Sequence, residues 1–141
     1  MLVFSVSVIP LIVIAIVNYF LSWIFYSPVV PWFKSWELAV GMVSKRKEIR
    51  EEVRKSPIIV MGLAFIATFI LSYGLQVIIH SMKVNDFLTG TLVGVIAWFT
   101  FALTLSLNTL FEGRKPLVLV LNNVLYLITY ALYGGILAIW K

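Results

Sequence analysis

Polar side chains recur at every fourth position within long apolar stretches of this 141-residue chain. Residues four apart lie on one face of a helix, so each series predicts a polar stripe along a helix. Amides and hydroxyls both donate and accept hydrogen bonds, and the chemistry that they offer is therefore binding without proton transfer. The three stripes are Thr68, Ser72, Gln76 and His80; Thr100, Thr104, Asn108 and Glu112; and Asn122, Tyr126, Tyr130 and Gly134, with Asn123 adjoining.

The residue types that enzymes need are scarce. The chain has no cysteine, six acidic residues and one histidine, His80, which we expect to be a hydrogen-bonding residue at a membrane boundary. Hydrolysis within a membrane needs a nucleophile with a base, a carboxylate pair or a metal site. Haem and iron–sulfur clusters need paired His, Cys or Met ligands. The sequence therefore predicts a protein that is not an enzyme and holds no cofactor and no metal.

The elements that position the polar stripes are predicted by four stretches without Asp, Glu, Lys or Arg. Each stretch exceeds the ~20 residues that cross ~30 Å of hydrocarbon at 1.5 Å per residue. Lipid offers the backbone no hydrogen-bond partners, so such stretches must be helices. We predict an all-α polytopic membrane protein, a single domain over residues 1–141, with transmembrane helices at about 3–26, 58–79, 88–111 and 117–139.

Composition and charge agree with a membrane protein. Hydrophobic residues make up 62% of the chain and charged residues 12%, against about 25% charged residues in soluble domains. The net charge of +5 comes from basic residues concentrated between 34 and 55 and at 114–115, with only Lys83 and Lys141 on the opposite side. This pattern argues against nucleic acid as a partner. By the positive-inside rule it predicts cytoplasmic basic loops and external termini.

The predicted cytoplasmic loop, about 31–56, has two parts. Its first part has aromatic residues on one side, including Trp32 and Trp36, and is expected to lie at the membrane interface, with Trp140 as the anchor at the opposite interface. Its second part, 45–55, predicts a basic helix. That helix is either a solvated connector or a docking patch for anionic lipid or an acidic partner.

Residues near the cytoplasmic ends of the predicted helices form a candidate polar cluster. Two interpretations stay open: the cluster sets helix register through hydrogen bonds worth about 0.6 kcal/mol each, or it binds a solute or an ion. Glu112 and Arg114 are expected to form an ion pair on which Tyr26 and the Ser27–Pro28 turn dock. The cluster comprises Asn18, Tyr26, Ser27, Pro28, Asn108, Glu112, Arg114, Asn122 and Asn123.

Gly90 and Gly94 have the G-x-x-x-G spacing that allows two membrane helices to approach closely. We expect these two glycines to pack against a neighbouring helix, either in the same chain or in another copy.

The chain also resembles a known family. Asn18, the run Phe25-Tyr26-Ser27-Pro28, Trp32 and Trp36 resemble the N-terminal signature of domain-of-unknown-function family 1761. The run 108–114 is similar to that family's L-N-x-x-F-E-x-R junction, and 134–140 is similar to its closing G-x-I-L-x-x-W. The resemblance implies a four-helix membrane protein and implies no activity, because the family is uncharacterised.

Two functions from different classes follow. The first is a non-catalytic membrane subunit, self-associating or accessory to a larger complex, whose partners are the lipid bilayer and other membrane subunits or copies of itself. The alternative is a channel or carrier for a small neutral solute, lined by the polar stripes.

Overall fold

A computed structural model describes residues 1–4, 7–40 and 57–140. In this part of the chain the structure is helical, without strands, and four helical segments are long and apolar enough to cross a membrane. The predicted fold class is therefore confirmed. The predicted basic helix at 45–55 lies outside the described residues. The segments are α1 (Val8–Phe25), α2 (Phe33–Val40), α4 (Pro57–Ser81), α5 (Phe87–Ala97), η1 (Trp98–Ala102), α6 (Leu103–Ser106), α7 (Asn108–Phe111) and α8 (Pro116–Ile139).

The helix ends follow local sequence signals. Helix α1 begins at Val8, so Pro10 lies in its first turn, where proline's missing N–H leaves no helical hydrogen bond unmade. Helix α5 is capped by Asp86, whose carboxylate accepts a hydrogen bond of 2.8 Å from the backbone N–H of Thr89. Helix α8 carries Pro116 at its first position, which is a favoured place for proline.

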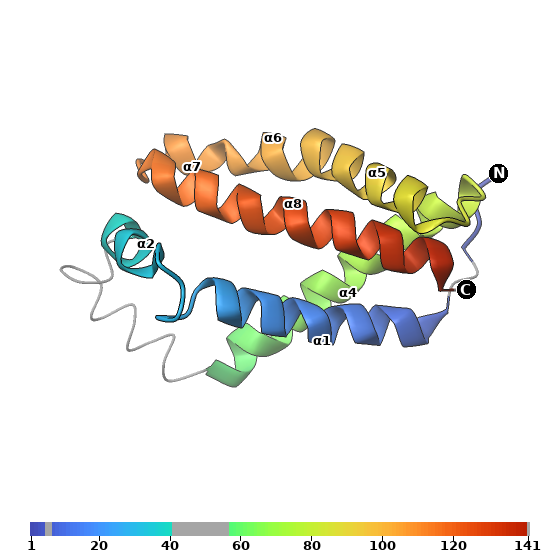
Figure 1. Cartoon of the computed structure of the whole chain (residues 1–141), viewed down its shortest axis with the longest axis horizontal. Helices are drawn as coiled ribbons and strands as arrows, with labels where there is room; N and C mark the ends of the chain where they lie inside the picture. The colour runs from blue at the N-terminus through green and yellow to red at the C-terminus, as the bar shows by residue number, and fades with distance from the viewer. Residues whose placement is uncertain (5–6, 41–56, 141) are drawn as a thin grey trace.

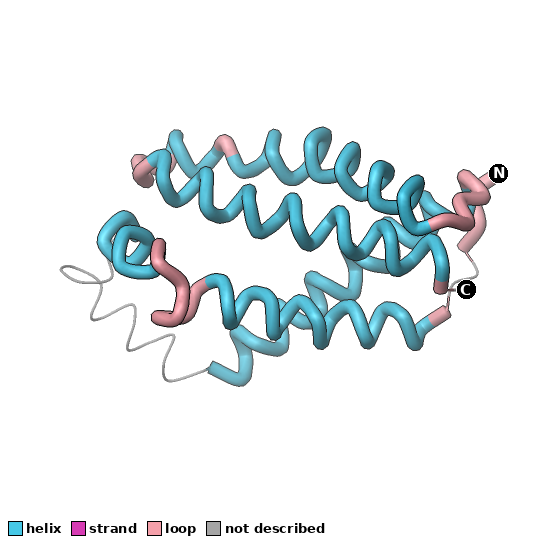
Figure 2. The backbone as a smooth tube through the Cα atoms, in the orientation of Figure 1, coloured by secondary structure: helices cyan, strands magenta, loops and turns pink. Residues whose placement is uncertain are grey.

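Consecutive spanning segments run antiparallel, and short turns join α4 to α5 and α7 to α8 (Figures 1 and 2). Both chain termini and the α4–α5 turn lie at one end of the bundle, called here the termini end. Helix α2 and the α7–α8 turn lie at the other, called here the α2 end (Figure 1). Which side of the membrane each end faces stays a prediction.

The third span packs closely against α8 through glycines. A Cβ atom added to Gly90 would collide with the carbonyl oxygen of Gly134, and one added to Gly94 would collide with that of Tyr130. The neighbour of the G-x-x-x-G pair is thus α8 of the same chain, and a third glycine on α8 completes the contact.

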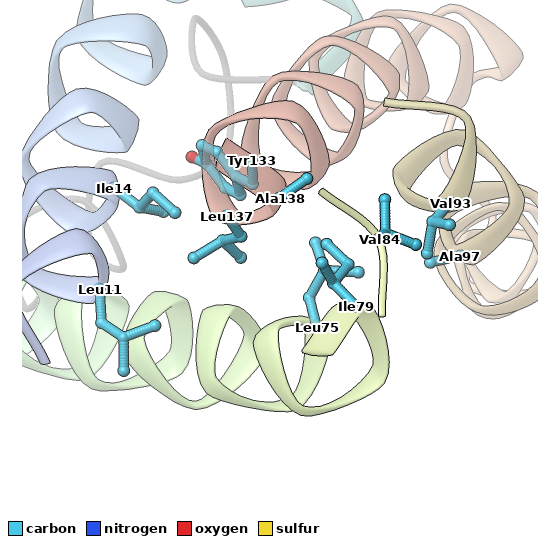
Figure 3. Close-up of a cluster of buried hydrophobic side chains, with 10 residues drawn as sticks. All are labelled: Leu11, Ile14, Leu75, Ile79, Val84, Val93, Ala97, Tyr133, Leu137 and Ala138. Atoms are coloured by element: carbon cyan, nitrogen blue, oxygen red, sulfur yellow. The ribbon is translucent and has the colours of Figure 1, made fainter. Parts of the chain in front are cut away.

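The hydrophobic core lies towards the termini end, where all four spans meet. Figure 3 shows side chains from α1, α4, α5 and α8 converging there. Apolar packing therefore closes this end, although Gln76 of α4 is also fully buried in the termini half of the bundle. The buried core residues are Leu11, Ile14, Leu75, Ile79, Val84, Val93, Ala97, Tyr133, Leu137 and Ala138.

Candidate functional site

A polar cavity of about 430 Å³ extends from the middle of the bundle towards the α2 end. Helices α1, α4 and α8 and the segment from η1 to α7 form its walls. Its lining contains amide, hydroxyl and phenol groups, and none of the lining residues is Asp, Glu, Lys or Arg. The cavity therefore offers hydrogen bonds without a fixed charge. The polar residues of its lining are Asn18, Thr68, Ser106, Thr109, Asn122, Tyr126, Thr129, Tyr130 and Tyr133.

A chain of hydrogen bonds crosses three helices at one wall of the cavity. The Tyr133 hydroxyl donates to Oδ1 of Asn18 at 2.6 Å, and Nδ2 of Asn18 donates to the Thr68 hydroxyl at 2.9 Å. Thr68 in turn donates to the carbonyl oxygen of Ala64, also at 2.9 Å. Because Asn18 and Thr68 each accept one hydrogen bond and donate the next, this series of bonds fixes the amide of Asn18 and joins α8, α1 and α4.

A second contact joins the end of α1 to α8. The Tyr26 hydroxyl donates to Oδ1 of Asn122 at 2.5 Å, and the Tyr26 ring packs 4.8 Å from that of Trp36 on α2. The indole N–H of Trp32 donates to the Phe25 carbonyl oxygen at 3.0 Å. The two predicted interfacial tryptophans thus hold α2 against the end of α1. Within the described residues, Asn122 makes only this one side-chain hydrogen bond, and its NH₂ group is free to face the cavity.

Asn123, which is buried, joins α8 to α6. Its Nδ2 atom donates to the Ser106 hydroxyl at 2.7 Å and to the Leu119 carbonyl oxygen at 2.9 Å. Ser106 donates onward to the Leu103 carbonyl oxygen at 2.7 Å. The hydrogen bond between Asn123 and Ser106 holds the segment after η1 in one orientation against α8.

The π-helix η1 decides the orientation of the polar stripe on the third span. The backbone N–H of Leu103 bonds to the carbonyl oxygen of Trp98, five residues back, so η1 contains one residue more than an α-helical turn would. An extra residue rotates everything beyond it by about 100°. The stripe Thr100, Thr104, Asn108 and Glu112 was expected to face either the bundle interior or another subunit, and all four side chains are exposed on the outside of the bundle.

Other residues take the inward positions of the third span. Ala102, Leu105, Ser106 and Thr109 line the cavity in place of the predicted stripe. Asn108 is exposed and consequently does not join the polar cluster. Nothing in the one-dimensional pattern of polar residues indicates the π-helix.

The boundary ion pair forms, but away from the cavity. Nε of Arg114 lies 3.0 Å from Oε2 of Glu112, and both side chains are about half exposed. Tyr26 bonds to Asn122 and not to this pair, which differs from the expected docking. Ser27 is buried in the turn after α1, where its hydroxyl donates to the Ile24 carbonyl oxygen at 2.9 Å, and Pro28 is exposed.

The remaining predicted residues lie elsewhere. Gln76 is fully buried among the four spans, outside the cavity lining, and neither atom of its side-chain amide has a hydrogen-bond partner in the described part of the chain. The His80 Nε2 atom is likewise buried without a partner. Trp140 follows α8 at the termini end and is partly exposed.

Thr129 and Tyr133 are cavity residues that the sequence argument did not single out. A strict spacing of four drifts by about 40° per step, because an α-helix repeats every 3.6 residues. The series 122, 126, 130, 134 therefore ends at Gly134, which packs on α5. Alternating steps of four and three, 122, 126, 129 and 133, follow the cavity wall and would have found both residues.

Comparison with known proteins places the chain in context. A family model described as a protein of unknown function, DUF1761, matches residues 9–138, nearly the whole chain. The resemblance indicated by the sequence motifs is thereby confirmed. No curated protein and no solved structure matches the chain.

Proposed function

We propose that this chain, which belongs to the DUF1761 family of proteins of unknown function, is a carrier that binds a small uncharged ligand in the polar cavity. The observation that carries the proposal is the cavity itself. It has the size of small-molecule sites, ~300–1,000 Å³, and combines apolar walls with a few converging polar groups.

The charge of the ligand follows from the lining. A charged ligand buried at membrane depth needs an opposite charge beside it, because its lost hydration costs several kcal/mol. The cavity lining has no Asp, Glu, Lys or Arg, and its amide and hydroxyl groups suit a neutral hydrogen-bonding ligand.

Particular residues would hold the ligand. The oxygen of the Asn122 amide accepts a hydrogen bond from Tyr26, which sets the orientation of the amide. Its NH₂ group is then available as a donor to the ligand. Tyr126 and Tyr130 line the same wall as Asn122 on α8. The hydrogen bonds from Tyr133 to Asn18 and from Asn18 to Thr68 tie this α8 wall to the walls formed by α1 and α4.

A carrier is a better match than an open channel. The apolar core closes the bundle at the termini end, beyond the cavity, where Leu11, Ile14 and Leu137 are almost fully buried. A binding site that is closed towards one end agrees with alternating access, whereas a continuous pore would have to pass through this core.

The test compares two asparagines at similar depth. Purified protein in phosphatidylcholine vesicles is assayed for flux of radiolabelled glycerol and urea, with Asn122→Leu and Asn108→Leu as matched variants. Asn122 faces the cavity and Asn108 faces outward. We expect Asn122→Leu to abolish saturable flux and Asn108→Leu to preserve it, while both variants elute as folded protein in detergent. Absence of saturable flux in the unmodified protein, or an equal loss in both variants, would contradict the proposal.

We also propose, as a second candidate function, self-association as a membrane subunit. The outward orientation of Thr104 and Asn108 favours it, because lipid offers these polar groups no partner. Hydroxyl and amide groups are each donor and acceptor, so the same face of a second copy is complementary to it.

The absence of cysteine from the chain makes this second proposal easy to test. Thr104→Cys is oxidised in native membranes, with Ile66→Cys, an exposed position on α4, as the control. A disulfide-linked dimer with Thr104→Cys alone supports the proposal. Monomer in both variants, or equal cross-linking, contradicts it.

A further inference from the structure

A second hollow, called here the lateral groove, lies between α4 and the middle of the third span. Its volume is about 210 Å³, and its lining is almost wholly apolar: Ile70, Gly74, Ile78, Ala97 and Phe101. The Ile70 and Phe101 side chains are 64% and 56% exposed on the outer surface of the bundle. Because these positions lie within membrane-spanning segments, the lateral groove faces the acyl chains of the bilayer.

The lateral groove adjoins the polar cavity. Leu71 and Tyr130 line both hollows, one from α4 and the other from α8. The π-helix contributes to both as well, since Phe101 lines the groove and the next residue, Ala102, lines the cavity. The two hollows therefore lie side by side at Leu71 and Tyr130, with the polar groups on the side of the α2 end and the apolar lining beyond.

Gly74 differs from the glycines that pack α5 on α8. A Cβ atom added to Gly74 would meet no heavy atom within 4 Å, whereas one added to Gly90 would collide with backbone. Helix packing thus gives no reason for a glycine at position 74. Its effect is to keep the groove wide beside Ile70 and Ile78.

From this juxtaposition we propose that the ligand is a neutral amphiphile that enters sideways from the bilayer. Its uncharged, hydrogen-bonding head occupies the polar cavity, and its hydrocarbon chain lies in the lateral groove. The inference rests on the proposed ligand-binding function and narrows the class of ligand. The head at the α2 end and the chain towards the bilayer centre match the orientation of a lipid in the leaflet beside α2.

Selectivity in this arrangement comes from the head group. A hydrocarbon chain gains no hydrophobic free energy by moving from lipid into the groove, because lipid tails are as apolar as the groove lining. Hydrogen bonds to groups such as Asn122 distinguish the head from the chain, and the groove supplies the space that a chain attached to a bound head must occupy. An alkane of equal length therefore gains nothing.

The test uses hexadecanol carrying a photoreactive diazirine in its chain, with the full-length protein in phosphatidylcholine vesicles. After irradiation, labelled peptides are identified by mass spectrometry. We expect labelling at residues 70–78 and near Phe101, competed by unlabelled hexadecanol and unaffected by hexadecane. Labelling spread evenly over all lipid-facing helices, or equal competition by hexadecane, would overturn the inference.

Two glycine variants on α4 give the matched comparison. Gly74→Leu fills the groove, and Gly62→Leu adds the same side chain at an exposed position where a Cβ atom also meets nothing within 4 Å. Leucine is a better helix former than glycine, so both variants should fold. We expect Gly74→Leu to reduce site labelling by about tenfold, equal to ~1.4 kcal/mol, and Gly62→Leu to leave it unchanged.

Asn122→Leu separates this inference from the proposed function. If hexadecanol labelling falls in both Gly74→Leu and Asn122→Leu, the two hollows form one amphiphile site. If glycerol or urea flux depends on Asn122 while hexadecanol neither competes nor responds to Gly74→Leu, the amphiphile inference falls and the carrier proposal stands. If no probe is bound or carried, both fall.

Discussion

At the scale of single residues, the cavity depends on a few amides whose hydrogen bonds link different helices. The Asn18 amide accepts a hydrogen bond from Tyr133 and donates one to Thr68. The Asn122 amide accepts one from Tyr26, and the Asn123 amide donates one to Ser106. An asparagine amide has two donors and an acceptor, so one side chain can join two partners on different helices. Register and binding, which the sequence left as alternatives, are thus compatible in this arrangement. The same bonds that set the helices also orient the cavity wall.

Removal of one hydroxyl tests this chain of bonds. Tyr133→Phe deletes the donor to Asn18 and should lower the free energy of unfolding by about 0.6 kcal/mol, and by no more than about 1.7 kcal/mol, the range for such bonds in membranes. Thermal or denaturant unfolding in detergent measures the change. Tyr73→Phe is the control, since Tyr73 is exposed on α4 and makes no side-chain hydrogen bond in the described part of the chain. An equal change in both variants would argue against the link.

At the scale of elements, the π-helix decides which residues of the third span the cavity receives. It separates the glycine face, which packs on α8, from a downstream face that carries Ser106 and Thr109. π-helical turns occur often at functional sites, and here the turn borders both hollows.

Deletion of one residue from η1 should restore an α-helical register. Removal of Phe99, which is exposed, takes out the extra residue that η1 accommodates, so we expect an α-helical turn that leaves Ser106 opposite Asn123. Phe99→Ala removes the same side chain and keeps the π-helical turn. Unfolding in detergent should therefore give the two variants similar stability. A deletion variant far less stable than Phe99→Ala would contradict the role assigned to η1.

The N-terminal cap of α5 predicts a pH dependence. The backbone N–H of Thr89 donates to Asp86 and holds the pKa of that carboxyl below its usual value. A lowered pKa in the folded state means that the cap stabilises the protein at pH values above the pKa of the unfolded carboxyl. That stability is lost as the pH falls through the lowered pKa of the folded state.

Unfolding of the protein and of Asp86→Asn, measured from neutral to acid pH, checks this expectation. Asparagine can also cap a helix but does not titrate, so the difference in stability between the two proteins should shrink on acidification. A difference that stays constant across the range would show that Asp86 does not act through its charge.

The elements could be predicted from the sequence because membrane helices follow from length and charge alone. The four stretches without charged residues correspond to α1, α4, the segment from α5 to α7, and α8. The inward faces were harder to predict. The sequence left open whether Thr104 and Asn108 face the bundle interior or another subunit, because the register shift at Trp98–Ala102 depends on backbone hydrogen bonding, for which side-chain periodicity has no signal. Tyr133 was missed because a strict period of four departs from 3.6 within three turns.

At the scale of the whole molecule, the bundle is asymmetric along its length. Glycine contacts and the hydrophobic core hold the termini end together, and the polar cavity occupies the region towards the α2 end. The lateral groove adjoins that cavity at Leu71 and Tyr130. At the α2 end, Trp36 of α2 packs on Tyr26, whose hydroxyl bonds to the cavity residue Asn122.

The most direct test of this account is thiol accessibility in the cysteine-free chain. Ser106→Cys places a thiol on the cavity wall, and Thr104→Cys places one two residues away on the outer surface of the bundle. A polar maleimide reacts with a thiolate, which forms in water and not in lipid. In membrane vesicles permeable to the reagent, we predict that Ser106→Cys is modified and is protected by hexadecanol, whereas Thr104→Cys is not modified. Modification of Thr104→Cys with Ser106→Cys unreactive would contradict the cavity and the helical register that forms it.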